Sequence, residues 1–138
     1  IDLRNIDIPL YFFAAEGDHI VPWLAVYSGL PLYGNAQERR FVLGESGHIA
    51  GAINPVTKDR RSYWTGNTEG KSAEEWRATA ENHKGSWWKD LNTWLSGRSG
   101  NLVNAPKTLG NSSHKPQADA PGDYVRAQAM NVVKAHLV

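Results

Sequence analysis

The 138-residue sequence contains no cysteine. Within this chain, that absence excludes a disulfide, a zinc–thiolate site and a cysteine nucleophile. The sequence also lacks an apolar run of the roughly 18 residues that a membrane helix needs. The chain also has no large excess of charge of either sign, because 15 basic residues are balanced by 14 acidic ones, and these charges are scattered along the chain. We therefore expect neither a membrane span nor a nucleic-acid interface.

Two similar units occupy the first third of the chain, each an apolar run followed by a loop with glycine and a titratable side chain. Residues 8–15 lead into Asp18 and His19, and residues 40–43 lead into the glycine-flanked His48. Continuous apolar runs are typical of parallel strands that are buried on both faces. Open α/β sheets place their chemistry beyond the carboxyl ends of such strands. We therefore predict two neighbouring parallel strands with acid and histidine at one edge.

The segment between these runs predicts a crossover helix over residues 22–30. Pro22 is favourable at the first helical position, and Gly29 and Pro31 end the stretch. A helix that joins adjacent parallel strands makes a right-handed crossover. The order of strand, helix and strand predicts an α/β fold.

The middle of the chain predicts one irregular segment and one capped helix. Residues 56–72 are polar and are expected to be irregular. Ser72 followed three residues later by Glu75 forms a capping box, which marks the start of a helix. That helix is predicted from Ala73 to about His83.

A further helix and a tail are predicted at the C-terminal side. The helix begins at Gly85-Ser86 and ends at Gly97, with an apolar stripe at helical spacing that consists of Trp87, Leu91, Trp94 and Leu95. Residues 99–138 are rich in Gly, Ser, Asn and Pro at their start, which is typical of an extended tail. We expect residues 1–98 to belong to a catalytic domain, and the tail to carry a short terminal helix over residues 125–137.

Asp18 and His48 appear in the order that closes a catalytic triad, in which a nucleophile is followed by an acid and then a histidine. A histidine can accept and return a proton near neutral pH, and a carboxylate can fix its tautomer and orientation. Each residue alone also has an ordinary structural explanation, a loop hydrogen bond for His48 and a turn for Asp18. The pair at two strand ends is more specific than either residue.

Ser46 and His19 are weaker candidates. Gly44-Glu-Ser-Gly-His48 resembles the nucleophile elbow G-x-S-x-G, but its second glycine comes one position early. The position that the elbow reserves for this glycine is His48, whose side chain would crowd the turn. The nucleophile is therefore expected upstream, in a larger protein of which this chain is the C-terminal piece. His19 is left open between a structural hydrogen-bond partner and a residue that lines a substrate channel.

Seven segments resemble the C-terminal part of class I poly(3-hydroxyalkanoate) synthases, in the same order and at close spacing. These segments are Asp18–Trp23, Arg40–Gly44, Ser46–Gly51, Ile53–Pro55, Ser62–Thr65, Gly85–Trp88 and Ala120–Val125. The resemblance covers nearly the whole chain. It implies the C-terminal portion of an α/β-hydrolase fold, in an enzyme whose catalytic cysteine is missing from this sequence.

The resemblance also implies an activity and its setting. The enzyme would polymerise 3-hydroxyacyl-CoA to a polyester with release of CoA, with Asp18 and His48 in a Cys-His-Asp triad and with no cofactor or metal. It would act in the cytoplasm at polyester granules, as a homodimer of the full-length protein. This chain alone is expected to be inactive.

Two other interpretations stay open. One is another α/β-hydrolase, of the esterase or lipase type, with a serine upstream; only the residue at the elbow separates it from the polymerase. The other is a non-catalytic module that binds the granule surface or a partner through its tryptophans and tail. The missing nucleophile favours the module, whereas the presence of both Asp18 and His48 weighs against it.

Overall fold

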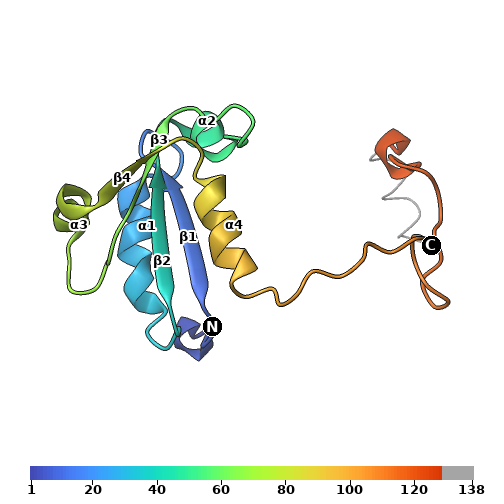
Figure 1. Ribbon diagram of the computed structural model, residues 1–138, viewed down its shortest axis with the longest axis horizontal. Helices are drawn as coiled ribbons and strands as arrows, with labels where there is room; N and C mark the ends of the chain where they lie inside the picture. The colour runs from blue at the N-terminus through green and yellow to red at the C-terminus, as the bar shows by residue number, and fades with distance from the viewer. Residues whose placement is uncertain (129–138) are drawn as a thin grey trace. The chain divides into compact units, whose positions relative to one another are not determined.

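The computed structural model describes residues 1–128 of the chain (Figure 1). The chain divides into two compact units, of which the first runs from Ile1 to Gly100 and the second begins at Asn101. Among the described residues, every strand and α-helix belongs to the first unit. The candidate site therefore has to be sought there.

The second unit contains, within its described residues, the single short 3-10 helix η3 (Tyr124–Arg126). The terminal helix predicted over residues 125–137 lies mainly outside the described residues. The predicted division into a catalytic domain and a tail stays a prediction.

The first unit is built on a mixed four-stranded sheet with the strand order β1-β2-β3-β4. Strand β1 (Leu10–Ala15) runs parallel to β2 (Arg39–Gly44), paired from Leu10 opposite Arg39 to Ala15 opposite Gly44. Helix α1 (Trp23–Gly29) lies between them in the sequence and continues into the short 3-10 helix η2 (Leu30–Leu32). The predicted pair of parallel strands with a crossover helix is confirmed.

Strands β3 and β4 correct the prediction for the middle of the chain. Strand β3 (Ser62–Thr65) lies in the segment expected to be irregular, and it pairs antiparallel with β2. Helix α3 (Ala73–Thr79) ends four residues before the predicted end at His83. Ala80 adopts an extended backbone, and β4 (Glu81–Lys84) then pairs with β3. The polar sequence of β4 carries no strand pattern of its own, so its pairing with β3 decides its structure.

The predicted capping box is present at the start of α3. Ser72 Oγ accepts the backbone N–H of Glu75 at 3.2 Å, and Glu75 Oε2 accepts the backbone N–H of Ser72 at 2.8 Å. These two bonds satisfy backbone donors that have no partner inside the helix. The start of α3 could therefore be predicted, although its end could not.

Helix α4 (Trp88–Ser96) begins later than predicted, with Trp87 as its N-cap. Gly85 has a positive φ of 96° and lies outside the helix. It ends before Gly97, as expected. One member of the predicted apolar stripe does not pack, since Leu95 is 47% exposed. None of the helices in the described part of the chain is long and apolar enough to cross a bilayer.

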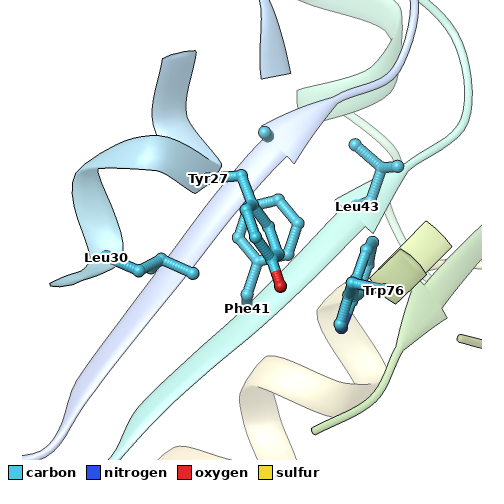
Figure 2. Close-up of a cluster of buried hydrophobic side chains, with 6 residues drawn as sticks. Tyr27, Leu30, Phe41, Leu43 and Trp76 are labelled. Carbon is cyan, nitrogen blue, oxygen red and sulfur yellow. The ribbon is translucent and has the colours of Figure 1, made fainter. Parts of the chain in front are cut away.

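Helices cover both faces of the sheet. Successive side chains of a strand point to opposite faces, so each strand can pack against helices on both sides. On one face, Phe41 and Leu43 of β2 pack with Tyr27 of α1 and Trp76 of α3. Figure 2 shows these side chains gathered between the strands and helices. Trp76 is fully buried and meets the rings of Tyr27 and Phe41 at centroid distances of 5.7 Å and 4.8 Å.

The opposite face of the sheet carries α4 and the short helix α2 (His48–Ala52). There, Phe13 of β1 stacks on the ring of Trp87, and Tyr11 meets Trp94 edge to face. Phe13 and Tyr11 alternate along β1 with the residues that face α1. A strand covered on both faces explains the continuous apolar run in its sequence.

Candidate active site

The Asp18 side chain is held by the turn that follows β1. Its Oδ1 atom accepts the backbone N–H groups of Ile20 and Val21, each at 2.9 Å. The side chain is only 9% exposed. The turn thus occupies one carboxylate oxygen and leaves Oδ2 for another partner.

His48 supplies that partner. Its Nδ1 atom lies 2.7 Å from Asp18 Oδ2, so the contact expected from the two strand ends is present. An ionised carboxylate can only accept hydrogen bonds, and Nδ1 must therefore carry the proton. Nε2 of a neutral ring then carries the lone pair, and the His48 side chain is 45% exposed. We refer to Asp18 and His48 as the dyad.

The loop predicted around His48 is instead the start of a helix. His48 is the first residue of α2, and Gly47 precedes it as the N-cap without a side-chain hydrogen bond. Gly51 packs so closely that a Cβ there would lie 2.8 Å from the Cβ of Ala15. This contact seats α2 directly on the end of β1. Gly51 thus allows the close packing of α2 against β1.

The environment of Asp18 favours its ionised form. Hydrogen bonding from the backbone N–H of Val21 is the largest cause, opposed by desolvation and supported by the His48 side chain and the N–H of Ile20. Together these lower the pKa of Asp18 to about 2. Asp18 is therefore a carboxylate at neutral pH, suited to accept the imidazole N–H and to stabilise an imidazolium.

Backbone contacts tie the two loops of the dyad together. The N–H of Gly17 donates to the carbonyl of Ser46 at 2.9 Å, and the N–H of Glu16 donates to the carbonyl of Gly44 at 2.8 Å. Ser46 has a positive φ of 84°, a conformation that favours glycine. Among the described residues, its hydroxyl forms no hydrogen bond with an imidazole. Ser46 thus contributes to the site through its backbone.

A cavity of about 230 Å³ lies beside the dyad. It is bounded by both dyad residues and otherwise by apolar side chains, namely Phe13, Ala14, Ala15, Val21, Val26 and Ala52. An apolar cavity with a few converging polar groups is the usual form of a small-molecule site. The arrangement can hold a small apolar group next to the imidazole.

His19 does not join the dyad. The residue is exposed, and within residues 1–128 its side chain makes no hydrogen bond or ion pair. Its role as a channel-lining or supporting residue stays a prediction.

The described residues contain no group of three or more His, Cys, Asp or Glu side chains that could hold a metal ion.

Two tryptophans contact the end of the helix that begins with His48, which the sequence pattern did not indicate. The indole N–H groups of Trp87 and Trp88 donate to backbone carbonyls at the C-terminal end of α2. The adjacent Trp-Trp pair at the start of a helix was the visible signal. Its partners are about 36 positions earlier in the chain, which no local pattern reveals.

Comparison with known proteins finds polymerases as relatives. The poly(3-hydroxyalkanoate) polymerase subunit PhaC of Cupriavidus necator is 46% identical over 129 residues, which cover 94% of this chain and 22% of that protein. Poly(3-hydroxyalkanoate) polymerase 1 of Ectopseudomonas oleovorans is 36% identical over 125 residues, with coverage of 91% and 22%. The PhaC subunit of Rhizobium etli is 37% identical over 125 residues, with coverage of 91% and 19%.

No protein-family model matches the chain. The chain spans about a fifth of the length of the curated relatives that it matches. The similarity nevertheless extends over more than nine-tenths of the chain and is repeated in several bacteria. The chain therefore belongs to the poly(3-hydroxyalkanoate) polymerase family.

Proposed function

We propose that this chain supplies the acid and the histidine of a Cys-His-Asp triad in a class I polyester synthase of the α/β-hydrolase fold. The observation that carries the proposal is the 2.7 Å contact between Asp18 Oδ2 and His48 Nδ1, at the carboxyl ends of two parallel strands. The names of the relatives support a poly(3-hydroxyalkanoate) product. The cysteine would come from a part of the parent protein outside this sequence.

In the first half-reaction, His48 Nε2 takes the proton of the cysteine thiol. The thiolate attacks the thioester carbonyl of 3-hydroxyacyl-CoA, and the bond to the CoA sulfur breaks. The CoA thiolate leaves with the proton from His48, and the acyl group remains on the cysteine as a thioester. Thiolates are the reactive form of cysteine, so an imidazole within reach is the activating group that this step requires.

In the second half-reaction, the 3-hydroxyl of one acyl group attacks the carbonyl of another acyl thioester. His48 Nε2 accepts the hydroxyl proton, an ester bond forms, and the thioester bond breaks. The sulfur that leaves takes this proton back from the imidazolium and departs as a thiol. We assign the base to His48 because both oxygens of Asp18 are already engaged and its pKa of about 2 makes it a weak base. Asp18 then acts through the imidazole, as the residue that orients it.

The setting of the parent protein forms part of the same proposal. We propose a cytoplasmic enzyme that works at the surface of polyester granules as a homodimer. Mass measurement of the purified parent protein tests the dimer, and a fluorescent fusion viewed in polyester-producing cells tests the granule location.

The test of the histidine uses the parent protein and a single turnover of 3-hydroxybutyryl-CoA. His48→Ala should slow the initial release of CoA by roughly 10⁴-fold or more, as for triad members that act as a unit. His114→Ala is a matched control, because His114 is exposed and belongs to the second unit. If His48→Ala released CoA as fast as this control, the proposed role of His48 would be wrong.

Asp18→Asn separates orientation from acylation. A cysteine and a histidine can form an ion pair without a third member, so part of the initial CoA release should survive. Chain extension should suffer more, because an alcohol is far harder to deprotonate than a thiol with a pKa of about 8.5. Asp119→Asn, at an exposed position of the second unit, is the control. If Asp18→Asn loses the initial release as completely as His48→Ala does, this division of roles is wrong.

The identity of the nucleophile is tested with selective reagents on the parent protein. Iodoacetamide should abolish activity, and prior loading with substrate should protect against it, because a thiolate is the reactive group. Inactivation by a fluorophosphonate without sensitivity to iodoacetamide would instead indicate the serine esterase.

A further inference from the structure

The position of His48 depends on contacts from outside its own helix. Helix α2 has five residues, and helices this short are not stable by themselves in water. Its N-cap, Gly47, provides no side-chain hydrogen bond. The carbonyl groups at its C-terminal end have no partner within the helix and need donors from elsewhere.

Two indoles supply donors there, in addition to the backbone N–H of Asn54, which donates to the carbonyl of Ala52 at 3.2 Å. Trp87 Nε1 donates to the carbonyls of Gly51 and Ala52 at 3.1 Å and 3.2 Å, and Trp88 Nε1 donates to the carbonyl of Ala52 at 3.0 Å. The ring planes of the two tryptophans are nearly perpendicular, at 87°. The C-terminal end of α2 is therefore hydrogen-bonded from two directions. We refer to Trp87 and Trp88 as the indole clamp.

The clamp is anchored to the strand that carries the acid. The ring of Trp87 stacks on Phe13 of β1, with a centroid distance of 4.0 Å and an angle of 18° between the planes. Phe13 in turn lies so close to Gly44 that a Cβ there would be 2.8 Å from its ring. The strand that leads to Asp18 is thus connected through Phe13 and Trp87 to the helix that begins with His48.

We propose that Trp87 and Trp88 are positioning residues that hold α2 so that the His48 ring stays on Asp18 and its Nε2 stays directed at the reacting atoms. The inference rests on the proposed function, because it assigns the residues to the same reaction. Phe13 and Ala52, which the clamp holds, also line the cavity beside the dyad. A shift of α2 would therefore move the imidazole and the cavity wall together.

The test replaces the indoles by phenylalanine in the parent protein, singly and together. Phenylalanine keeps an aromatic ring against Phe13 but has no N–H donor. Trp94→Phe is the matched control on the same helix, since its indole is half-buried and donates to Glu38 Oε1 at 3.2 Å, away from α2. The double variant Trp87→Phe/Trp88→Phe removes all three bonds to α2.

The first readout is hydrogen exchange of the peptide that spans residues 46–54, which needs no substrate. The double variant should exchange about tenfold faster there, because local opening is controlled by the hydrogen bonds that hold the segment. Exchange in β1 and β2 should stay unchanged. If the double variant is too unstable to purify, each single variant should still accelerate exchange about threefold. Exchange equal to that of Trp94→Phe would overturn the clamp.

The second readout is the kinetics with 3-hydroxybutyryl-CoA. The double variant should lower kcat about 10- to 100-fold with little change in KM, because a small misplacement of a catalytic group mainly affects the reacting geometry. Faster exchange with the kcat of Trp94→Phe would overturn the positioning role. A parent protein that shows no acyl transfer at all would instead sink the proposed function, and the exchange data would still decide whether the indoles hold α2.

Discussion

At the scale of single residues, the dyad is an asymmetric pair. The Asp18 side chain is 9% exposed and accepts three hydrogen bonds, whereas 45% of the His48 side chain is exposed. The histidine is therefore the member of the dyad that can exchange a proton with a reacting group. The proximity of these two residues could be predicted from the sequence, since both follow apolar runs that form adjacent parallel strands.

The low pKa of Asp18 leads to a prediction about acid stability. A carboxyl group with a pKa of about 2 in the folded protein and about 3.9 in the unfolded chain stabilises the fold above pH 4. That contribution is lost as the pH falls from about 4 through about 2. The difference in thermal stability between the parent protein and its Asp18→Asn variant should therefore shrink as the pH falls from 5 towards 2. An equal difference at pH 5 and pH 2.5, measured by thermal unfolding, would contradict the assignment.

Ser46 yields a prediction that separates backbone from side chain. Its φ of 84° favours glycine, so Ser46→Gly should leave the stability within about 1 kcal/mol of the parent protein, because relief of strain offsets the added chain entropy. Acyl transfer should also be unchanged, since only the Ser46 carbonyl is used by Gly17. Loss of CoA release in Ser46→Gly, with thermal stability retained, would make the hydroxyl a candidate nucleophile.

At the scale of elements, the sequence predicts best where a local signal and the packing agree. Apolar runs mark β1 and β2, and the capping box marks the start of α3. Strand β3 did carry a weak signal, because Tyr63, Trp64 and Thr65 are residue types that favour strands. Strand β4 carried none, and the indole clamp depends on residues about 36 positions apart. Long-range pairing explains both omissions.

Helix α4 is joined to the sheet by a half-buried network around Asp90. Arg40 of β2 makes a bidentate ion pair with Asp90, and the hydroxyl of Tyr11 of β1 donates to Asp90 Oδ2 at 2.9 Å. Burial alone would raise the pKa of Asp90, but the bonds from Arg40 and Tyr11 outweigh it and hold that pKa below its usual value. The network fixes the helix that begins with the indole clamp.

Breaking this network on one side should be costly. Arg40→Met leaves a carboxylate that is only 13% exposed without its cation, and we expect a loss of roughly 2–3 kcal/mol of unfolding free energy. The double variant Arg40→Met/Asp90→Leu should recover most of the loss, because no unpaired charge remains. Chemical denaturation measures both. Equal stability of Arg40→Met and the parent protein would show that the pair contributes nothing.

At the scale of the whole molecule, the chain holds two of the three groups that the proposed chemistry needs. The cavity, the acid and the histidine lie together, but the sequence contains no cysteine. The resemblance in sequence could predict the family, and the structure adds how the histidine is oriented. The nucleophile could not be located, because it does not belong to these 138 residues under the proposed function.

We therefore expect the purified 138-residue chain to be inactive. It should release no CoA from 3-hydroxybutyryl-CoA above the rate of a His48→Ala version of the same chain. A thiol-release assay with excess chain measures this directly. Release that depends on His48 would show that a nucleophile exists within these residues, and Ser46 would be the first to replace.

The parallel strand β1 lies at the margin of the described sheet, with β2 as its one partner among residues 1–128. Its sequence, Leu-Tyr-Phe-Phe-Ala-Ala, has the composition of a strand from the middle of a sheet. One row of its backbone N–H and C=O groups is thus available to another strand, which makes it a template for β-addition. Prepared alone, this chain should self-associate at high concentration and bind β-sheet-sensing dyes. Charged substitutions along β1 should suppress that aggregation, and so should the remainder of the parent protein, if that remainder supplies the neighbouring strand.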